Sequence, residues 1–126
     1  MPELPEVETI RQNLRRGGAT LPSILGWNVE SAQVLWARSL VMPGVDEFKR
    51  RLIGQQVVDI GRRGKFLIVE LSKDALLIHL RMSGDLVVEE NREPVATHCR
   101  VAIEFENGQR LAFIDARKFG RLWLTA

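Results

Sequence analysis

The first nine residues, MPELPEVET, have the clearest chemical potential in the chain. Removal of Met1 would leave Pro2 with a free secondary amine, and an amine attacks a carbonyl-like carbon only in its neutral form. A chain-terminal amine is closer to neutrality than a lysine, with a pKa of about 7.7–8.0 against about 10.4. Glu3 lies beside it as a proton donor or acceptor. The same residues also suit an ordinary helix start, so both interpretations stay open.

Three later segments add a cation, an apolar side chain and a guanidinium–ring pair. Lys65 follows GRRG and opens the strand-like run KFLIVEL, where it is either solvated or placed against an anion. Met82, in HLRMSG, lies in a predicted turn, where it either joins the core or protrudes. Arg117 and Phe119 occur together in DARKFGR. A guanidinium and a ring on one loop suit hydrogen bonding to base edges and insertion between bases, which favours a nucleic-acid partner.

The two histidines and the single cysteine limit the remaining chemistry. His98 stands at a strand entrance, where a phosphate contact is feasible, whereas His79 lies inside an apolar run and is expected to be a satisfied core histidine. The only cysteine, Cys99, excludes an internal disulfide and a multi-cysteine zinc site. No His, Cys, Asp or Glu set has metal-ligand spacing, and no glycine-rich phosphate loop occurs. The chain is therefore expected to hold no metal.

Charge is unevenly distributed along the chain, although the formal net charge is only +2. Residues 49–65 contain six basic side chains against one acidic, and residues 110–121 contain four against one. Residues 85–94 reverse the sign, with four acidic side chains against one basic. This segregation either suits a polyanion met on one face or reflects ordinary solvated surfaces.

The hydrophobic pattern predicts two helices. The first has apolar residues at helical spacing and ends at Gly17-Gly18, with Pro5 suited to its first position; its apolar stripe is Leu4, Val7, Ile10 and Leu14. A shorter helix is expected from about Asp46, as its cap, to Gly54. Neither these segments nor the strand-like runs provide the roughly 20 apolar residues of a membrane span, and the N-terminus has no signal-peptide pattern.

The rest of the chain reads as short strands. The runs are an early strand over 26–35, then QVVDI, KFLIVEL, ALLIHL, DLVVEE, RVAIEF and RLAFIDA, with Asn107-Gly108 as a hairpin turn between the last two. In RVAIEF the residues Val101, Ile103 and Phe105 should face inward. KFLIVEL and ALLIHL are almost wholly apolar, so both of their faces are expected to be covered. The pattern predicts one α+β domain, mainly β: an antiparallel β-sandwich with an N-terminal helix and one further short helix.

Taken together and in this order, MPELPEVET, GRRGKFLIVEL, HLRMSG and DARKFGR resemble the N-terminal domain of bacterial formamidopyrimidine-DNA glycosylase, which removes oxidised purines from DNA. The resemblance extends over essentially all 126 residues and is sharpest in those four segments. The PELPE start and the Arg-Lys-Phe-Gly loop favour this branch over the endonuclease-eight-like relatives, which act mainly on oxidised pyrimidines.

The resemblance implies a set of catalytic roles. Pro2 matches the nucleophile that attacks the sugar C1′ and forms a Schiff base, and Glu3 matches the acid that protonates the opening sugar. Glu6 matches a supporting carboxylate at the helix start. Lys65 matches the lysine assigned to phosphate contact and β-elimination.

The resemblance also implies how the chain meets duplex DNA. His98, Arg117 and Lys118 match DNA-contacting positions. Met82, Arg117 and Phe119 match the three side chains that fill the gap left by a flipped nucleotide, with Arg117 facing the orphaned cytosine. Filling that gap offsets the cost of extruding the damaged base, which is a few kcal/mol.

Two departures qualify these expectations. Met1 is present in the sequence, and if it is retained the Pro2 nitrogen is an amide and the Schiff base cannot form. The family enzymes are about twice as long and continue into a helix–two-turn–helix region and a four-cysteine zinc finger, both absent from this sequence. Residues 1–126 are therefore expected to form a single truncated catalytic domain without the structural zinc, with impaired glycosylase and abasic-site lyase activity. The alternative is an inactive module that binds damaged or distorted DNA. A bacterial cytoplasmic, nucleoid-associated monomer is expected.

Overall fold

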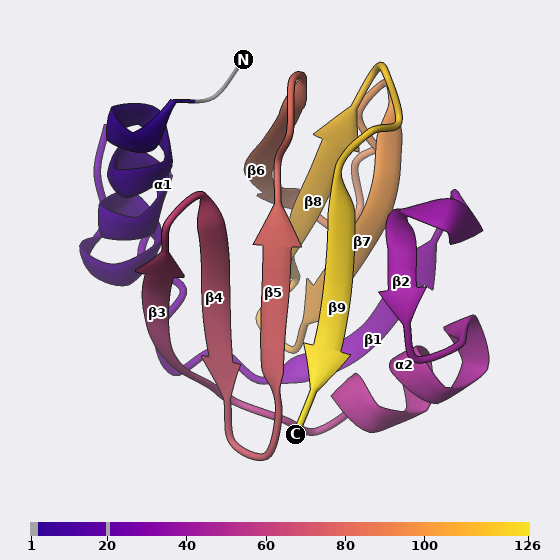
Figure 1. The fold of residues 1–126 in the computed structure, drawn as a ribbon. Helices are drawn as coiled ribbons and strands as arrows, with labels where there is room; N and C mark the ends of the chain where they lie inside the picture. The colour runs from indigo at the N-terminus through magenta and orange to yellow at the C-terminus, as the bar shows by residue number, and fades with distance from the viewer. Residues whose placement is uncertain (1–2, 20) are drawn as a thin grey trace.

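The computed structural model describes residues 3–19 and 21–126, which form two facing β-sheets and two α-helices (Figure 1). The helices are α1 (Leu4–Arg16) and α2 (Val45–Leu52), with a 3-10 turn at Ala37–Ser39. The strands are β1 (Val29–Val34), β2 (Leu40–Met42), β3 (Val57–Arg63), β4 (Phe66–Leu71), β5 (Ala75–His79), β6 (Gly84–Glu90), β7 (Cys99–Phe105), β8 (Gln109–Asp115) and β9 (Arg121–Thr125). Neither described helix is long and apolar enough to cross a bilayer.

The two sheets confirm the predicted sandwich. One has the strand order β1-β7-β8-β6 and the other the order β2-β9-β5-β4-β3. Every pair is antiparallel except β2 with β9, which is parallel. The strand β2 was not predicted, because three residues contain too little alternation to be recognised.

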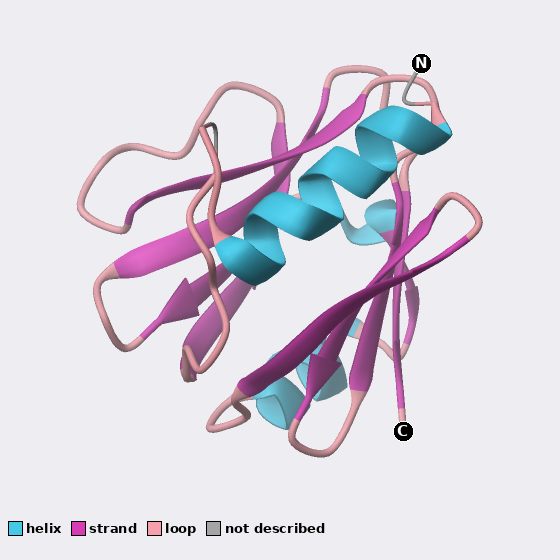
Figure 2. Ribbon diagram, turned by 90° about the vertical axis from the view of Figure 1, so that its left-hand side faces the viewer, coloured by secondary structure: helices cyan, strands magenta, loops and turns pink. Residues whose placement is uncertain are grey.

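The helix α1 confirms the first predicted element. It begins where the Glu3 amide donates to the Glu6 carboxylate at 3.0 Å, a bond typical of a capping box, and it ends at Gly17, whose φ of 83° suits glycine. Its buried stripe includes Val7 and Leu14. The helix packs on β3 and β4, and Figure 2 shows it lying across the opening between the two sheets.

The helix α2 also exists, but its predicted cap was wrong. Gly44 is the residue that precedes the first turn, and Asp46 lies within that turn, where its charge favours the positive end of the helix. The helix buries Phe48 and Leu52 against the β1 and β2 side of the sandwich. Each open side of the sandwich therefore has a helix beside it.

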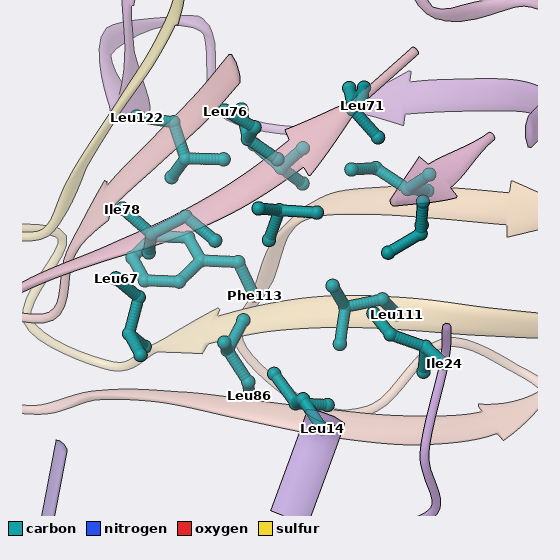
Figure 3. Close-up of a cluster of buried hydrophobic side chains, with 14 of the residues drawn as sticks. Leu14, Ile24, Leu67, Leu71, Leu76, Ile78, Leu86, Leu111, Phe113 and Leu122 are labelled. Carbon is teal, nitrogen blue, oxygen red and sulfur yellow. The ribbon is translucent and has the colours of Figure 1, made fainter. Parts of the chain in front are cut away.

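The core lies between the sheets, where alternate residues of each strand point inward. Val101, Ile103 and Phe105 are buried as predicted. Figure 3 shows Leu14 of α1 beside Leu86, in a cluster that also contains Phe113 and other apolar side chains from both sheets. Full burial of one such side chain contributes about 1.5–3 kcal/mol.

The outer face of the five-stranded sheet differs from the prediction. Phe66, Ile68 and Leu77 point away from the core and are only half-buried, so the expectation that both faces of β4 and β5 would be covered is wrong for the described residues. An apolar run alone could not reveal this, because it does not show which face has a covering element.

Two connections cross between the sheets at the same end of the sandwich. Residues 80–83 lead from β5 into β6, and residues 116–120 lead from β8 into β9. We call them the paired loops, and we call this end, at the top of Figure 1, the upper end. Because β5 and β9 are neighbours, the segment β6–β7–β8 leaves the five-stranded sheet and returns to it at adjacent strands.

Candidate nucleic-acid interface

The upper end gathers the described residues that the sequence singled out. The reason is topological: α1 begins there, β3 ends, β4 begins, β5 and β8 end, and β7 and β9 begin. The residues brought to this end are Glu3, Glu6, Lys65, Met82, His98, Arg117, Lys118 and Phe119. Pro2 lies outside the described residues.

The expected catalytic carboxylate and lysine lie close together. The Lys65 Nζ atom is 3.8 Å from the Glu3 Oε2 atom, and both side chains are partly open to solvent. Glu6 is held by the Glu3 amide, so it fixes the backbone that follows Pro2 rather than pairing with a cation. This arrangement places a carboxylate and a cation together at the start of α1.

The side chains of Met82, Arg117 and Phe119, which we call the wedge, protrude from the paired loops. Met82 and Phe119 each expose 46% of their surface, which is high for large apolar residues. The Arg117 guanidinium lies 5.4 Å from the centre of the Phe119 ring, within cation–π distance. An exposed apolar pair next to a cation is suited to entering a base stack.

Lys118 makes a different contact from its neighbour. Its Nζ atom lies 4.0 Å from the centre of the Trp36 ring, just beyond the end of β1. The Leu35 and Trp36 amides donate to the Arg100 carbonyl, at 2.7 and 3.2 Å, so this segment is fixed to the start of β7. Trp36 was not predicted as a site residue, because nothing in its own neighbourhood marks it.

Asp115 joins the paired loops and was also missed by sequence reasoning. Its carboxylate accepts hydrogen bonds from the Ser83 hydroxyl, from the Arg117 amide at 3.2 Å and from the Gly120 amide at 2.6 Å. Its amide donates to the His98 carbonyl at 3.0 Å, and its carbonyl accepts from the Arg100 Nε at 2.8 Å. The available signal was the turn preference of Asp and Ser beside the two motifs.

His98 occupies strained backbone next to this network. Its φ is 65°, in the left-handed region, and its side chain is exposed. Lys118 has a similar φ of 63°. Non-glycine residues in this conformation occur where surrounding contacts impose it, and they concentrate at functional sites.

His79 differs from the core histidine that was expected. It points away from the core, its ring lies edge-on to Phe66 at 4.8 Å, and its Nδ1 accepts from the Arg81 amide at 3.1 Å. Burial and the nearby charges of Arg81 and Lys65 lower the pKa of His79, which favours the neutral ring with its hydrogen on Nε2. The ring is half-buried.

The basic segment 49–65 does not form one face. Residues 49–51 lie on α2, whereas residues 62–65 lie at the upper end, because β3 runs the length of the sheet between them. Arg51 is paired with Asp74 at 2.6 Å, and the buried Arg110 is paired with a carboxylate on β6. The cations at the upper end are Arg62, Arg63, Lys65, Arg81, Arg100, Arg117, Lys118 and Arg121.

Within residues 3–19 and 21–126, no three His, Cys, Asp or Glu side chains converge as a metal site requires. Burial raises the pKa of the Cys99 thiol, which makes this cysteine a poor ligand and nucleophile. The described chemistry of the upper end is therefore that of cations, carboxylates and apolar side chains.

Comparison with known proteins gives consistent matches. The profile of the formamidopyrimidine-DNA glycosylase N-terminal domain matches residues 1–122. A formamidopyrimidine-DNA glycosylase of Pelotomaculum thermopropionicum is 42% identical over 126 residues, covering 99% of this chain and 44% of the relative. The chain thus spans less than half the length of that relative.

Solved structures agree with the sequence matches. The Lactococcus lactis Fpg protein in complex with DNA containing FAPY-dG has a TM-score of 0.87 and 34% identity, covering 98% of this chain and 44% of that chain. The same protein with DNA containing an abasic site also has a TM-score of 0.87 at 34% identity, covering 97% and 43%.

Proposed function

The chain belongs to the formamidopyrimidine-DNA glycosylase family through its N-terminal domain, and on that premise we propose that it acts in base-excision repair on oxidised purines in duplex DNA. The observation that supports this most directly is the meeting of the wedge, Lys65 and Glu3 at one end of the sandwich. A nucleotide must leave the base stack before its glycosidic bond can be reached. The wedge is suited to occupying the gap that remains.

The proposed reaction starts at the amine of Pro2 after loss of Met1. The amine forms a bond to the sugar C1′ while the glycosidic bond breaks, and the base departs with the electron pair and takes up the proton that the amine nitrogen loses. Glu3 donates a proton to the ring oxygen as the bond from C1′ to that oxygen opens, which leaves an iminium ion joining Pro2 to the sugar. Loss of a C2′ proton then expels the 3′ phosphate and cleaves the strand.

Apart from Arg117, which is expected to face the orphaned cytosine, the cations are proposed to bind the DNA backbone. Lys65 lies beside Glu3, where it can hold a phosphate next to the reacting sugar. His98, Arg117 and Lys118 lie on the same end and are proposed to contact the DNA around the gap. Contacts with phosphates release counterions, so binding should weaken steeply as salt is added.

Borohydride trapping on a duplex with an abasic site tests the proposal. The hydride reduces the iminium ion, so the expected product is a protein–DNA adduct whose peptide map places the link on Pro2. The matched control is a chain that retains Met1, because its Pro2 nitrogen is not a free amine. Pro2→Gly is a second variant, which keeps a free amine but loses the proline ring. Trapping through another residue, or trapping equal with Met1 retained, would contradict the proposed nucleophile.

The second candidate is a module that binds gapped or distorted DNA without catalysis. Its supporting observation is the exposed wedge, which needs no nucleophile to enter a duplex. Tight binding to the abasic-site duplex with no adduct from a chain that has lost Met1 would favour it.

A further inference from the structure

Asp115 is completely buried, although a buried carboxylate is costly unless it is well hydrogen-bonded. Among the described residues its carboxylate takes part in no ion pair, and the Arg100 guanidinium donates to its backbone carbonyl instead. Its three donors are instead the Ser83 hydroxyl and the amides of Arg117 and Gly120. One donor comes from the first paired loop and two come from the second.

Each of these donors is next to a wedge residue or belongs to one. Ser83 follows Met82, Gly120 follows Phe119, and Arg117 contributes its own amide. The Arg117 amide also lies 3.3 Å from the Ser83 hydroxyl oxygen, a second link between the loops. The Asp115 carboxylate therefore accepts one hydrogen bond from a wedge residue and two from the residues that directly follow the other two wedge residues.

We propose that Asp115 is a positioning residue that joins the paired loops into one preformed wedge. The inference rests on the proposed function, because a preformed wedge matters only if these side chains enter DNA. Two independent loops would each have to become ordered on binding, and that ordering would reduce affinity. A joined pair presents Met82 and Phe119 at a fixed separation before any DNA arrives.

A simpler role for Asp115 makes a different prediction. Aspartates often accept hydrogen bonds from amides a few residues ahead and so stabilise their own turn. The bonds from Arg117 and Gly120 fit that role, but the bond from Ser83 joins positions 32 residues apart in the sequence. The Ser83 hydroxyl is therefore the group that distinguishes joining two loops from stabilising one.

Amide hydrogen exchange tests the link without any DNA. In the 126-residue chain, Ser83→Ala should speed exchange of the Arg117 and Gly120 amides about tenfold, because a lost contact on one loop loosens the other. The matched control is Ser72→Ala, whose hydroxyl accepts from the Gln56 amide at 3.0 Å in the turn after β4. Unchanged exchange at Arg117 and Gly120 in a folded Ser83→Ala chain would overturn the proposal.

A double-mutant cycle then connects the link to DNA. The measured quantity is the ratio of dissociation constants for undamaged duplex and for the same duplex with an abasic site. Ser83→Ala should lower this ratio about fivefold, Ser83→Thr should restore it, and Ser83→Ala should have no effect in a Phe119→Ala background. Equal effects in both backgrounds would overturn the proposal.

The two measurements separate this inference from the function on which it rests. A wild-type chain that does not distinguish the two duplexes would contradict the proposed function, while the exchange rates would still decide whether Asp115 joins the loops. Accelerated exchange together with an unchanged binding ratio would show a joined pair of loops that DNA binding does not use, and that result would also overturn the proposed role.

Discussion

Asp115 at the upper end and Asp74 at the opposite, lower end are both buried carboxylates, but their partners differ in kind. Asp74, in the turn between β4 and β5, accepts from the Arg51 guanidinium and from the Gln55 side-chain amide, each at 2.6 Å. Asp115 accepts from a hydroxyl and two backbone amides. The Asp74 carboxylate is held by an ion pair, whereas the Asp115 carboxylate is held by neutral donors and the Arg100 Nε donates to the Asp115 backbone carbonyl instead.

This difference affects which cations at each end are neutralised by an ion pair. At the lower end, Arg51 is neutralised while it fastens α2 to the turn at Asp74. At the upper end, the described ion pairs involve neither Arg117 nor Lys118. Because Asp115 uses hydroxyl and amide donors, these two cations stay available to a polyanion.

The largest expected effect comes from crowding the upper end. A Cβ atom at Gly120 would lie 2.3 Å from the Phe113 Cζ atom and 3.0 Å from an Asp115 carboxylate oxygen. Gly120→Ala should therefore lower the free energy of unfolding by about 3 kcal/mol. Gly54→Ala at the lower end meets no atom within 4 Å but has a φ of 85°, so about 1 kcal/mol is expected. Urea denaturation of both variants measures the difference, and equal losses would contradict it.

Exchanging each carboxylate for an amide sharpens the comparison. In Asp115→Asn, the side-chain NH2 group would face at least one N–H donor from which the carboxylate oxygen now accepts. We therefore expect the free energy of unfolding to fall by about 2 kcal/mol. The variant should also bind undamaged duplex and abasic-site duplex equally well. Asp74→Asn should cost about 1 kcal/mol and leave DNA binding unchanged. Denaturation and binding are measured on the same preparations. A binding defect in Asp74→Asn would show that the two ends are not independent.

At acidic pH, wild type and Asp74→Asn should differ less in their free energy of unfolding. Burial raises the pKa of this carboxyl, but hydrogen bonds from Arg51 and Gln55 outweigh burial and hold the pKa below its ordinary value. A lowered folded-state pKa contributes stability above about pH 4, and that contribution is lost as pH falls through the folded value. Wild type and Asp74→Asn should therefore converge in stability as the pH falls below about 4. A constant difference as the pH falls would rule out the ionised pair as its source.

The smallest stability effects are expected at two exposed methionines, of which only one belongs to the wedge. Met82 is 46% exposed and Met42, at the end of β2, is 51% exposed. Alanine at either position should change the free energy of unfolding by no more than about 0.5 kcal/mol. Only Met82→Ala should weaken binding to an abasic-site duplex. A matching loss in Met42→Ala would place part of the interface on β2.

The elements most accessible from sequence were those with a long, regular pattern. The stripe in α1 and the alternation in β7 each repeat often enough to fix their type, and the loop around Arg117 and Phe119 indicated their exposure. Met82 was left open between core and surface, and it is exposed. The family resemblance assigned roles to Lys65 and Glu3 but gave no distance between them, and the structure places the Lys65 Nζ atom 3.8 Å from the Glu3 Oε2 atom. The assignment of Pro2 stays a prediction.

What sequence could not supply was contact between distant segments. The bond between Ser83 and Asp115 joins two motifs whose spacing carries no sign of it. The basic segment 49–65 seemed to be one cluster, but a full strand separates its halves in space. His79 was misplaced for a related reason, because an apolar strand does not show which of its faces is covered.

The crossing of both paired loops at one end has a consequence for how the domain can be altered. The segment 84–115 departs from β5 and rejoins the chain at β9, and the Ser83–Asp115 bond closes it at that point. It can therefore be exchanged between homologues as a cassette, provided that its inward face still fits the opposite sheet, that β7 still pairs with β1 and that position 115 keeps an aspartate to meet Ser83. Such grafts would not alter the segments that carry Pro2, Glu3 and Lys65.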